Sequence, residues 1–193
     1  MASGGDHQGA EGKVRVWDIE QGKLMHSIPQ TNHQGVCISP DGRWLVHTGP
    51  SAHTVWDVGT WALRAKFAQS PAGPTASAAF SPTSDVLALI VDDRSIELVD
   101  VAGMRTIAQL ESPDSIGQEA LTFSADGTKL LVPNARGHTI HMWDLRALRA
   151  HLAEMGLDLE LPPYPPAPST PPANPLRVEV DLGELAGPHA ESE

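Results

Sequence analysis

Apolar and polar residues alternate in short runs along most of this chain, and residues 120–145 show the pattern most clearly. Leu121 and Phe123 alternate with smaller or polar neighbours, residues 129–132 form a second apolar run, and residues 139–145 form a third. The intervening residues 124–127 and 134–137 are rich in Asn, Asp, Ser and Gly, which favour tight turns. This stretch therefore predicts three short antiparallel strands joined by two turns.

The same arrangement recurs upstream at a regular spacing. The turn serines Ser39, Ser81 and Ser124 lie 42 and 43 residues apart. The aspartates that end the third strand of each unit are 39, 43 and 44 residues apart along the series Asp18, Asp57, Asp100 and Asp144. The two series have nearly the same spacing, so we predict a tandem repeat. Each of the first three units should have a further outer strand, near residues 24–28, 64–67 and 106–110.

Two kinds of position define the repeat. The structural repeat positions are Asp41, Gly42, Asp126 and Gly127 in the turns, and Trp17, Asp18, Trp56, Asp57, Val99, Asp100, Trp143 and Asp144 at the strand ends. A Trp at one repeat position favours packing between neighbouring units over a ligand platform. We expect Trp61, which falls in a turn, to contribute less to stability.

The Ser-Pro-Asp-Gly turn and the closing Trp-Asp pair make the unit resemble a WD40 repeat, the blade of a β-propeller. The resemblance implies an all-β fold over residues 1–161, a partial WD40 β-propeller of about three and a half four-stranded antiparallel blades. Residues 1–6 resemble the end of a second strand, so we expect the chain to begin in mid-blade. Its open blade faces would then take the remaining blades or allow self-association.

Many WD40 blades also contain a hydrogen-bonded set of Asp, His, Ser or Thr, and Trp. Asp6 matches the Asp position in the first unit, Asp92 or Asp93 matches it in the third, and His33 matches the His position of the second. The other units depart from this pattern. The resemblance therefore implies that some blades are held more by apolar packing and have looser turns.

The period changes after Asp144. Leu145, Leu148, Leu152 and Met155 are three, four and three residues apart, which predicts an amphipathic helix at about residues 145–155. Asp144 is its expected N-cap, and Gly156 its expected end.

The remaining residues divide into a linker and a tail. Residues 162–175 are rich in Pro and predict an extended linker. Residues 176–193 form an acidic tail, in which the alternation over residues 176–182 favours one strand that adds to a sheet edge. A disordered acidic tail is the alternative.

Charge and composition narrow the function classes. The net charge of −11 and the pI near 5.1 disfavour binding to nucleic acid, which requires basic patches. The sequence has no membrane segment and no signal-peptide pattern, so we expect a cytoplasmic location. Cys37 is the single cysteine, which excludes an internal disulfide and favours a buried strand residue.

No catalytic, cofactor-binding or metal-binding residues are predicted. His138 and His141 are three residues apart, and such positions lie on opposite faces of a strand. His47 and His53 lie around one turn, without the further ligands that zinc requires. The serines lack the Gly-x-Ser-x-Gly context of a nucleophile elbow.

Residues 143–166 resemble the end of the propeller in large bacterial WD40-repeat proteins, many of which carry a serine/threonine protein kinase domain. The resemblance implies a non-catalytic scaffold that binds a protein partner. The alternative is the propeller of a larger bacterial kinase whose catalytic domain lies upstream. The kinase motifs His-Arg-Asp and Asp-Phe-Gly are absent from residues 1–193.

Overall fold

The computed structural model describes residues 2–3, 13–29, 35–70, 77–116, 120–134, 137–159, 161–164 and 166. Within these residues the fold is mostly β and contains four antiparallel sheets and one α-helix. The first sheet contains β1 (Ala2–Ser3), β2 (Lys13–Asp18) and β3 (Lys23–Pro29). The second contains β4 (Gly35–Ile38), β5 (Trp44–Thr48), β6 (Ala52–Asp57) and β7 (Leu63–Ala68). The third contains β8 (Ala78–Phe80), β9 (Val86–Ile90), β10 (Ser95–Asp100) and β11 (Arg105–Glu111). The fourth contains β12 (Thr122–Phe123), β13 (Lys129–Asn134) and β14 (Thr139–Asp144).

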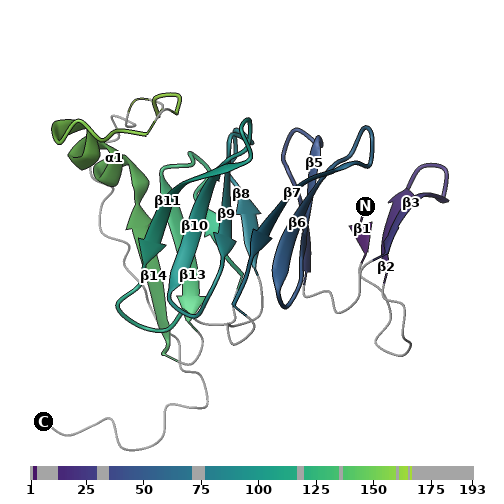
Figure 1. Ribbon diagram of the computed structural model, residues 1–193, viewed down its shortest axis with the longest axis horizontal. Helices are drawn as coiled ribbons and strands as arrows, with labels where there is room; N and C mark the ends of the chain where they lie inside the picture. The colour runs from purple at the N-terminus through teal and green to yellow at the C-terminus, as the bar shows by residue number, and fades with distance from the viewer. Residues whose placement is uncertain are drawn as a thin grey trace, which may run out of the picture.

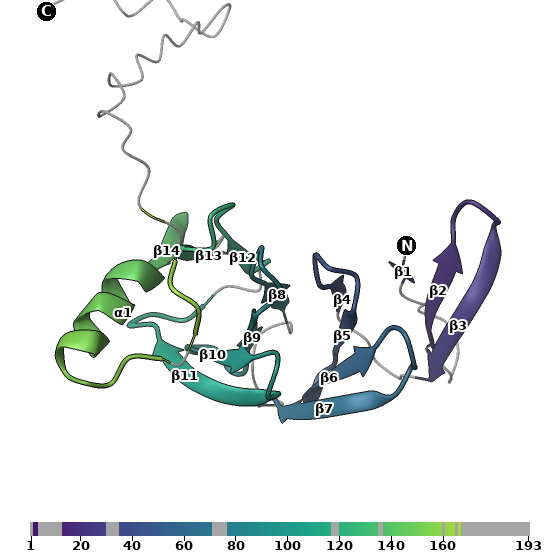
Figure 2. The same ribbon diagram turned by 90° about the horizontal axis from the view of Figure 1, so that it is seen from above.

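Each sheet is a meander in which every strand pairs with the next strand in sequence. The four sheets stand side by side (Figure 1). Seen from above, they follow an open arc, with β4, β8 and β12 on its inner side and β7 and β11 on its outer side (Figure 2). The expected outer strands are confirmed as β3, β7 and β11.

The hydrophobic core lies between the sheets. The cluster between the second and third sheets includes Trp44, Val46, Val55, Leu87, Leu89, Val91, Val99 and Val101. The cluster between the third and fourth includes Val86, Ala88, Ile90, Ile96, Leu98, Leu110, Ile116, Leu121, Leu130, Val132 and Leu145. Alternate residues of β9 thus face opposite neighbours, and all five are buried. A strand covered on both faces reads as a continuous apolar run.

The interface between the first and second sheets is smaller. Val14, Val16 and Ile28 of the first sheet pack against Leu45 of the second. Half-buried Trp56 also packs against this cluster. A smaller buried surface gives the first sheet less hydrophobic stabilisation than the third sheet receives.

The helix α1 (Leu145–Glu154) follows β14 directly, which confirms the predicted helix. The Asp144 carboxylate accepts a hydrogen bond from the Ala147 amide at 2.9 Å, as an N-cap residue does. The helix ends before Gly156, whose φ of 71° is a backbone conformation that favours glycine.

The helix stands where the second and third sheets have a fourth strand. Among the described residues β14 therefore pairs on one side alone, with β13. The strand expected at residues 176–182 and most of the Pro-rich linker lie outside the described residues. In the part of the chain that is described, no helix is long and apolar enough to cross a membrane.

Candidate functional site

The serine turns have a defined geometry. The Ser39 hydroxyl accepts a hydrogen bond from the Trp44 amide at 2.9 Å and donates one to the Asp41 carboxylate at 2.5 Å. Gly42 closes the turn with a φ of 73°, a left-handed conformation that glycine adopts without a Cβ penalty. The Ser39 hydrogen bond, the largest cause, lowers the pKa of Asp41.

The same bonds recur in the fourth sheet. Ser124 accepts from the Lys129 amide at 2.9 Å and donates to Asp126 at 2.6 Å. With Thr128 as a second donor, this bond lowers the pKa of Asp126 to about 2. Gly127 has a φ of 71°, and a Cβ there would lie 3.3 Å from Pro82 of the neighbouring turn.

The third sheet achieves this geometry with different residues. Ser81 accepts from the Val86 amide at 3.0 Å and donates to Asp85 at 2.7 Å, so the partner carboxylate lies two positions later than in the other turns. Ser84 takes the left-handed position, and its hydroxyl accepts from the Asp41 amide at 3.1 Å. This last bond ties the turns of the second and third sheets together.

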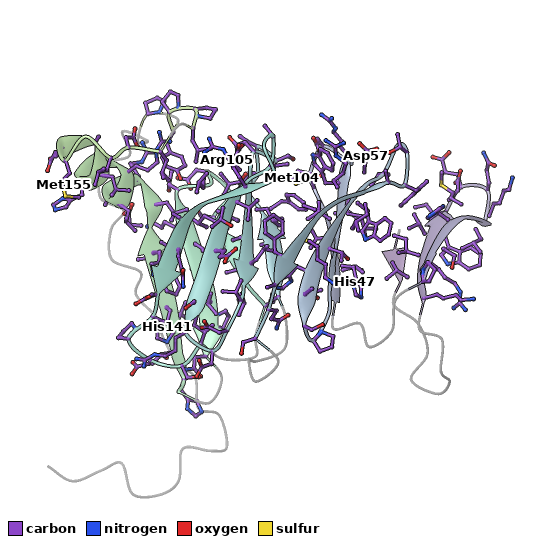
Figure 3. All side chains as sticks on the ribbon, viewed as in Figure 1. His47, Asp57, Met104, Arg105, His141 and Met155 are labelled. Carbon is purple, nitrogen blue, oxygen red and sulfur yellow. The ribbon has the colours of Figure 1, made fainter. Side chains whose placement is uncertain are left out.

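The strand-ending aspartates cap the next turn. Asp57 accepts from the Thr60 amide at 2.8 Å and the Thr60 hydroxyl at 3.0 Å, and these bonds lower its pKa. Asp18 and Asp100 likewise accept from amides two and three residues later. The fourth residue after each aspartate has a positive φ, at Gly22, Trp61 and Met104. Asp57, Met104 and Arg105 lie along the same edge of the sheets (Figure 3).

The residues before these aspartates were expected to pack between neighbouring sheets. Three of them do so, whereas the fourth, Trp17, is exposed. Val99 is buried between the second and third sheets, and Trp143 is half-buried against the third. Trp56 donates its indole N–H to the Thr54 hydroxyl at 3.1 Å. Thr54 in turn lies 3.5 Å from Nδ1 of His47, which forms a polar chain that the family pattern did not place here.

Trp61 lies in a turn, as expected, and contacts a neighbouring sheet as well. Its indole stacks on the His26 ring, with centroids 4.5 Å apart and planes inclined by 7°. Its side chain is half-buried against the cluster between the first and second sheets. The sequence gives no signal for this contact, because the ring partner lies 35 residues upstream.

The other histidines do not converge on one point, because His47 and His53 lie on paired strands of the second sheet but on opposite faces of it. His53 is fully buried, and its Nε2 lies 2.8 Å from the Ile90 carbonyl of the third sheet. Burial lowers the pKa of His53. His47 and His141 lie in different sheets (Figure 3), and His138 is exposed in a turn. Among the described residues no three His, Cys, Asp or Glu side chains are grouped to hold a metal ion.

Cys37 lies in β4 and packs against the cluster between the second and third sheets. Its burial raises the pKa of the thiol to about 12, which keeps it protonated at neutral pH. The thiol is therefore a poor nucleophile.

A cavity of about 140 Å³ opens between the serine turns of the third and fourth sheets. Its lining includes Ser81, Pro82, Thr83, Asp85, Val86, Phe123, Asp126, Gly127, Arg149, Leu161, Pro162, Pro163 and Tyr164. Aromatic and proline side chains thus lie beside two carboxylates in this cavity. Neither Arg149 nor Tyr164 was a candidate from the sequence.

Arg149 holds the chain after the helix against this cavity. Its guanidinium donates to the Asp158 carboxylate at 3.1 and 3.3 Å, to the Pro162 carbonyl at 2.7 Å and to the Leu161 carbonyl at 3.1 Å. The same guanidinium lies 5.2 Å from the centre of the Tyr164 ring. The Arg149 bond lowers the pKa of Asp158, and burial raises that of Tyr164.

No family model matches the sequence, and no curated protein matches it. Solved structures similar to it include a chain of hydrazine synthase from Kuenenia stuttgartiensis, with a TM-score of 0.59 and 14% sequence identity. The match covers 70% of this chain and 40% of that chain. At this identity the likeness concerns the fold alone.

Proposed function

We propose that this chain is a WD40-type β-propeller segment that acts as a non-catalytic scaffold for a protein partner. The observation that carries the proposal is the recurrence of one hydrogen-bonded turn in successive sheets, at Ser39, Ser81 and Ser124. A repeat that holds its turns in the same geometry presents them as one ordered surface. The fold likeness supports the proposal, because hydrazine synthase has a propeller-type fold.

The partner surface is the cavity between the third and fourth turns. Phe123 and Tyr164 give it apolar walls, and Asp85 and Asp126 give it carboxylates. Asp126 stays ionised at neutral pH because its pKa is about 2. The positive charge of Arg149 is already paired with Asp158.

Charge sets the chemistry of the partner. A cavity with apolar walls and two carboxylates, on a chain of net charge −11, favours a basic segment with one apolar anchor residue. Electrostatic complementarity of this kind speeds encounter and selects among partners.

Selection of random displayed peptides on the full chain tests the proposal. We expect enriched peptides in which Lys or Arg lies next to an aromatic or aliphatic residue. Asp126→Asn and Tyr164→Ala should each weaken their binding at least about tenfold, measured by fluorescence polarisation. His138→Ala is the control, because His138 is exposed at the opposite end of β13 from Asp126.

Two outcomes would refute the proposed surface. One is that no peptide is enriched. The other is that binding is unchanged in Asp126→Asn and Tyr164→Ala.

A propeller that belongs to a larger serine/threonine kinase stays a prediction, because a kinase domain would lie outside residues 1–193.

A further inference from the structure

The third strands of the four sheets align position by position. Strands β2, β6, β10 and β14 each have six residues and end on Asp. Their second and fourth residues are Val14 and Val16, His53 and Val55, Ile96 and Leu98, and Ile140 and Met142. In the first three sheets these side chains are at most 7% exposed, whereas Ile140 is 66% and Met142 is 55% exposed.

The difference has a structural cause. In each of the first three sheets, these positions face the sheet that follows in the chain. Val14 and Val16 pack with Leu45 of the second sheet, and Ile96 and Leu98 pack with the fourth. Ile140 and Met142 occupy the same positions in the fourth sheet, after which the described residues contain no further sheet. We call the surface around Ile140 and Met142 the trailing face.

The opposite end of the arc has the complementary surface. The fifth residue of each third strand faces the preceding sheet, as Trp56, Val99 and Trp143 do. Trp17 has this position in the first sheet and is 39% exposed. Leu24, its cross-strand partner, lies on the same face and is 41% exposed, close to the 50% of Leu63 at the same position of the second sheet. We call the surface of Trp17 and Leu24 the leading face.

We propose that the trailing face of one copy packs against the leading face of a second copy, and that two such contacts close a ring of eight sheets. The occupant is a second copy because one chain presents both halves of a contact that it already makes three times internally. The first and fourth sheets, which carry these faces, lie at the two ends of an open arc (Figure 2). Eight sheets fall within the range of known propeller rings.

The geometry of the contact limits the possible assemblies. Because the leading and trailing faces differ, the contact is heterologous, and such contacts form either closed rings or open filaments. Each sheet would have to turn by about 45° for eight to close a ring. The contact is separate from the cavity between the serine turns, so either proposal can fail while the other stands.

Light scattering coupled to size-exclusion chromatography of the full chain tests the ring. We expect twice the monomer mass of 20.6 kDa. Met142→Lys on the trailing face and Trp17→Glu on the leading face should each halve that mass. Leu63→Lys should leave it unchanged, because Leu63 is a 50% exposed apolar residue of the outer strand β7 and belongs to neither face. Far-UV circular dichroism checks that each variant is folded.

Mixing the two variants separates this contact from a symmetric one. An equimolar mixture of Trp17→Glu and Met142→Lys should recover the dimer mass, because one contact then joins two unaltered faces. At the second contact, the introduced carboxylate and ammonium groups face each other. A symmetric contact between two trailing faces would leave Trp17→Glu dimeric and overturn the proposal.

Other outcomes would also overturn it. If the wild-type chain has the mass of a monomer, no ring forms. If deletion of residues 167–193 converts a monomer into a dimer, the trailing face is covered by the chain's own tail and not by a second copy. Filaments that grow with concentration show that the contact does not close.

Discussion

The third and fourth sheets share one strand pattern, yet their neighbours give them different environments. Every residue of β9 is buried, because sheets cover both of its faces. In β13, the central strand of the fourth sheet, Leu130 and Val132 are buried against the third sheet, whereas Leu131 between them is half-buried. An apolar residue at a given repeat position is therefore a core residue only where a neighbouring sheet covers it.

The largest effect should come from truncating the fourth residue of the third strand, which is Leu98 in the third sheet and Met142 in the fourth. Leu98 is 4% exposed, so Leu98→Ala should destabilise the protein by about 2–5 kcal/mol through lost burial and a cavity. Met142→Ala, at the equivalent position, should cost less than half as much in the monomeric Trp17→Glu background. Urea denaturation of both measures the difference. Equal losses would mean that the trailing face is covered within one chain.

The second sheet extends the comparison of equivalent positions. The second residue of its third strand is His53, where the third sheet has Ile96. Burial lowers the pKa of His53, so the unfolded chain takes up a proton first as the pH falls. The stability linked to His53 is fully present above about pH 6.5 and is lost as the pH falls through the lower folded-state pKa.

His53→Gln removes this linkage and keeps a donor for the Ile90 carbonyl. The wild type should therefore lose more stability than His53→Gln as the pH is lowered from 7 towards 5, measured as the urea midpoint at each pH. His138→Gln, at an exposed site, is the control. Parallel pH profiles for the wild type and His53→Gln would contradict a buried neutral imidazole.

The sequence predicted the elements well because their signals are local. The serine turns, the strand-ending aspartates and the helix after Asp144 each depend on hydrogen bonds between residues a few positions apart. Even the irregular third turn was located, although Asp85 supplies its carboxylate from a different position.

The candidate site could not be predicted, because its contacts are distant in sequence. The cavity joins the turn after Ser81 to Tyr164, and Arg149 binds carbonyl groups beyond the end of its own helix. The family's polar set was expected at Asp6, at His33 and at Asp92 or Asp93. Asp6 and His33 lie outside the described residues, and Asp92 accepts a hydrogen bond from the Arg94 amide at 2.8 Å within its own turn. In the second sheet, a chain of polar contacts runs from Trp56 through Thr54 to His47. Periodicity shows which face of a strand is apolar, and says nothing about which element covers it.

The smallest predicted effect concerns the residue after which the third and fourth sheets differ, the aspartate that ends the third strand. Asp100 caps a turn that leads into β11, whereas Asp144 caps α1. Asp144→Ala removes the acceptor for the Ala147 amide and should cost about 1 kcal/mol of stability in urea denaturation. It should also speed hydrogen exchange in the first turn of α1. Glu154→Ala removes the same charge from the exposed end of this helix and should change stability by less than about 0.5 kcal/mol. If Asp144→Ala costs no more than Glu154→Ala, the Asp144 carboxylate does not stabilise the helix as a cap.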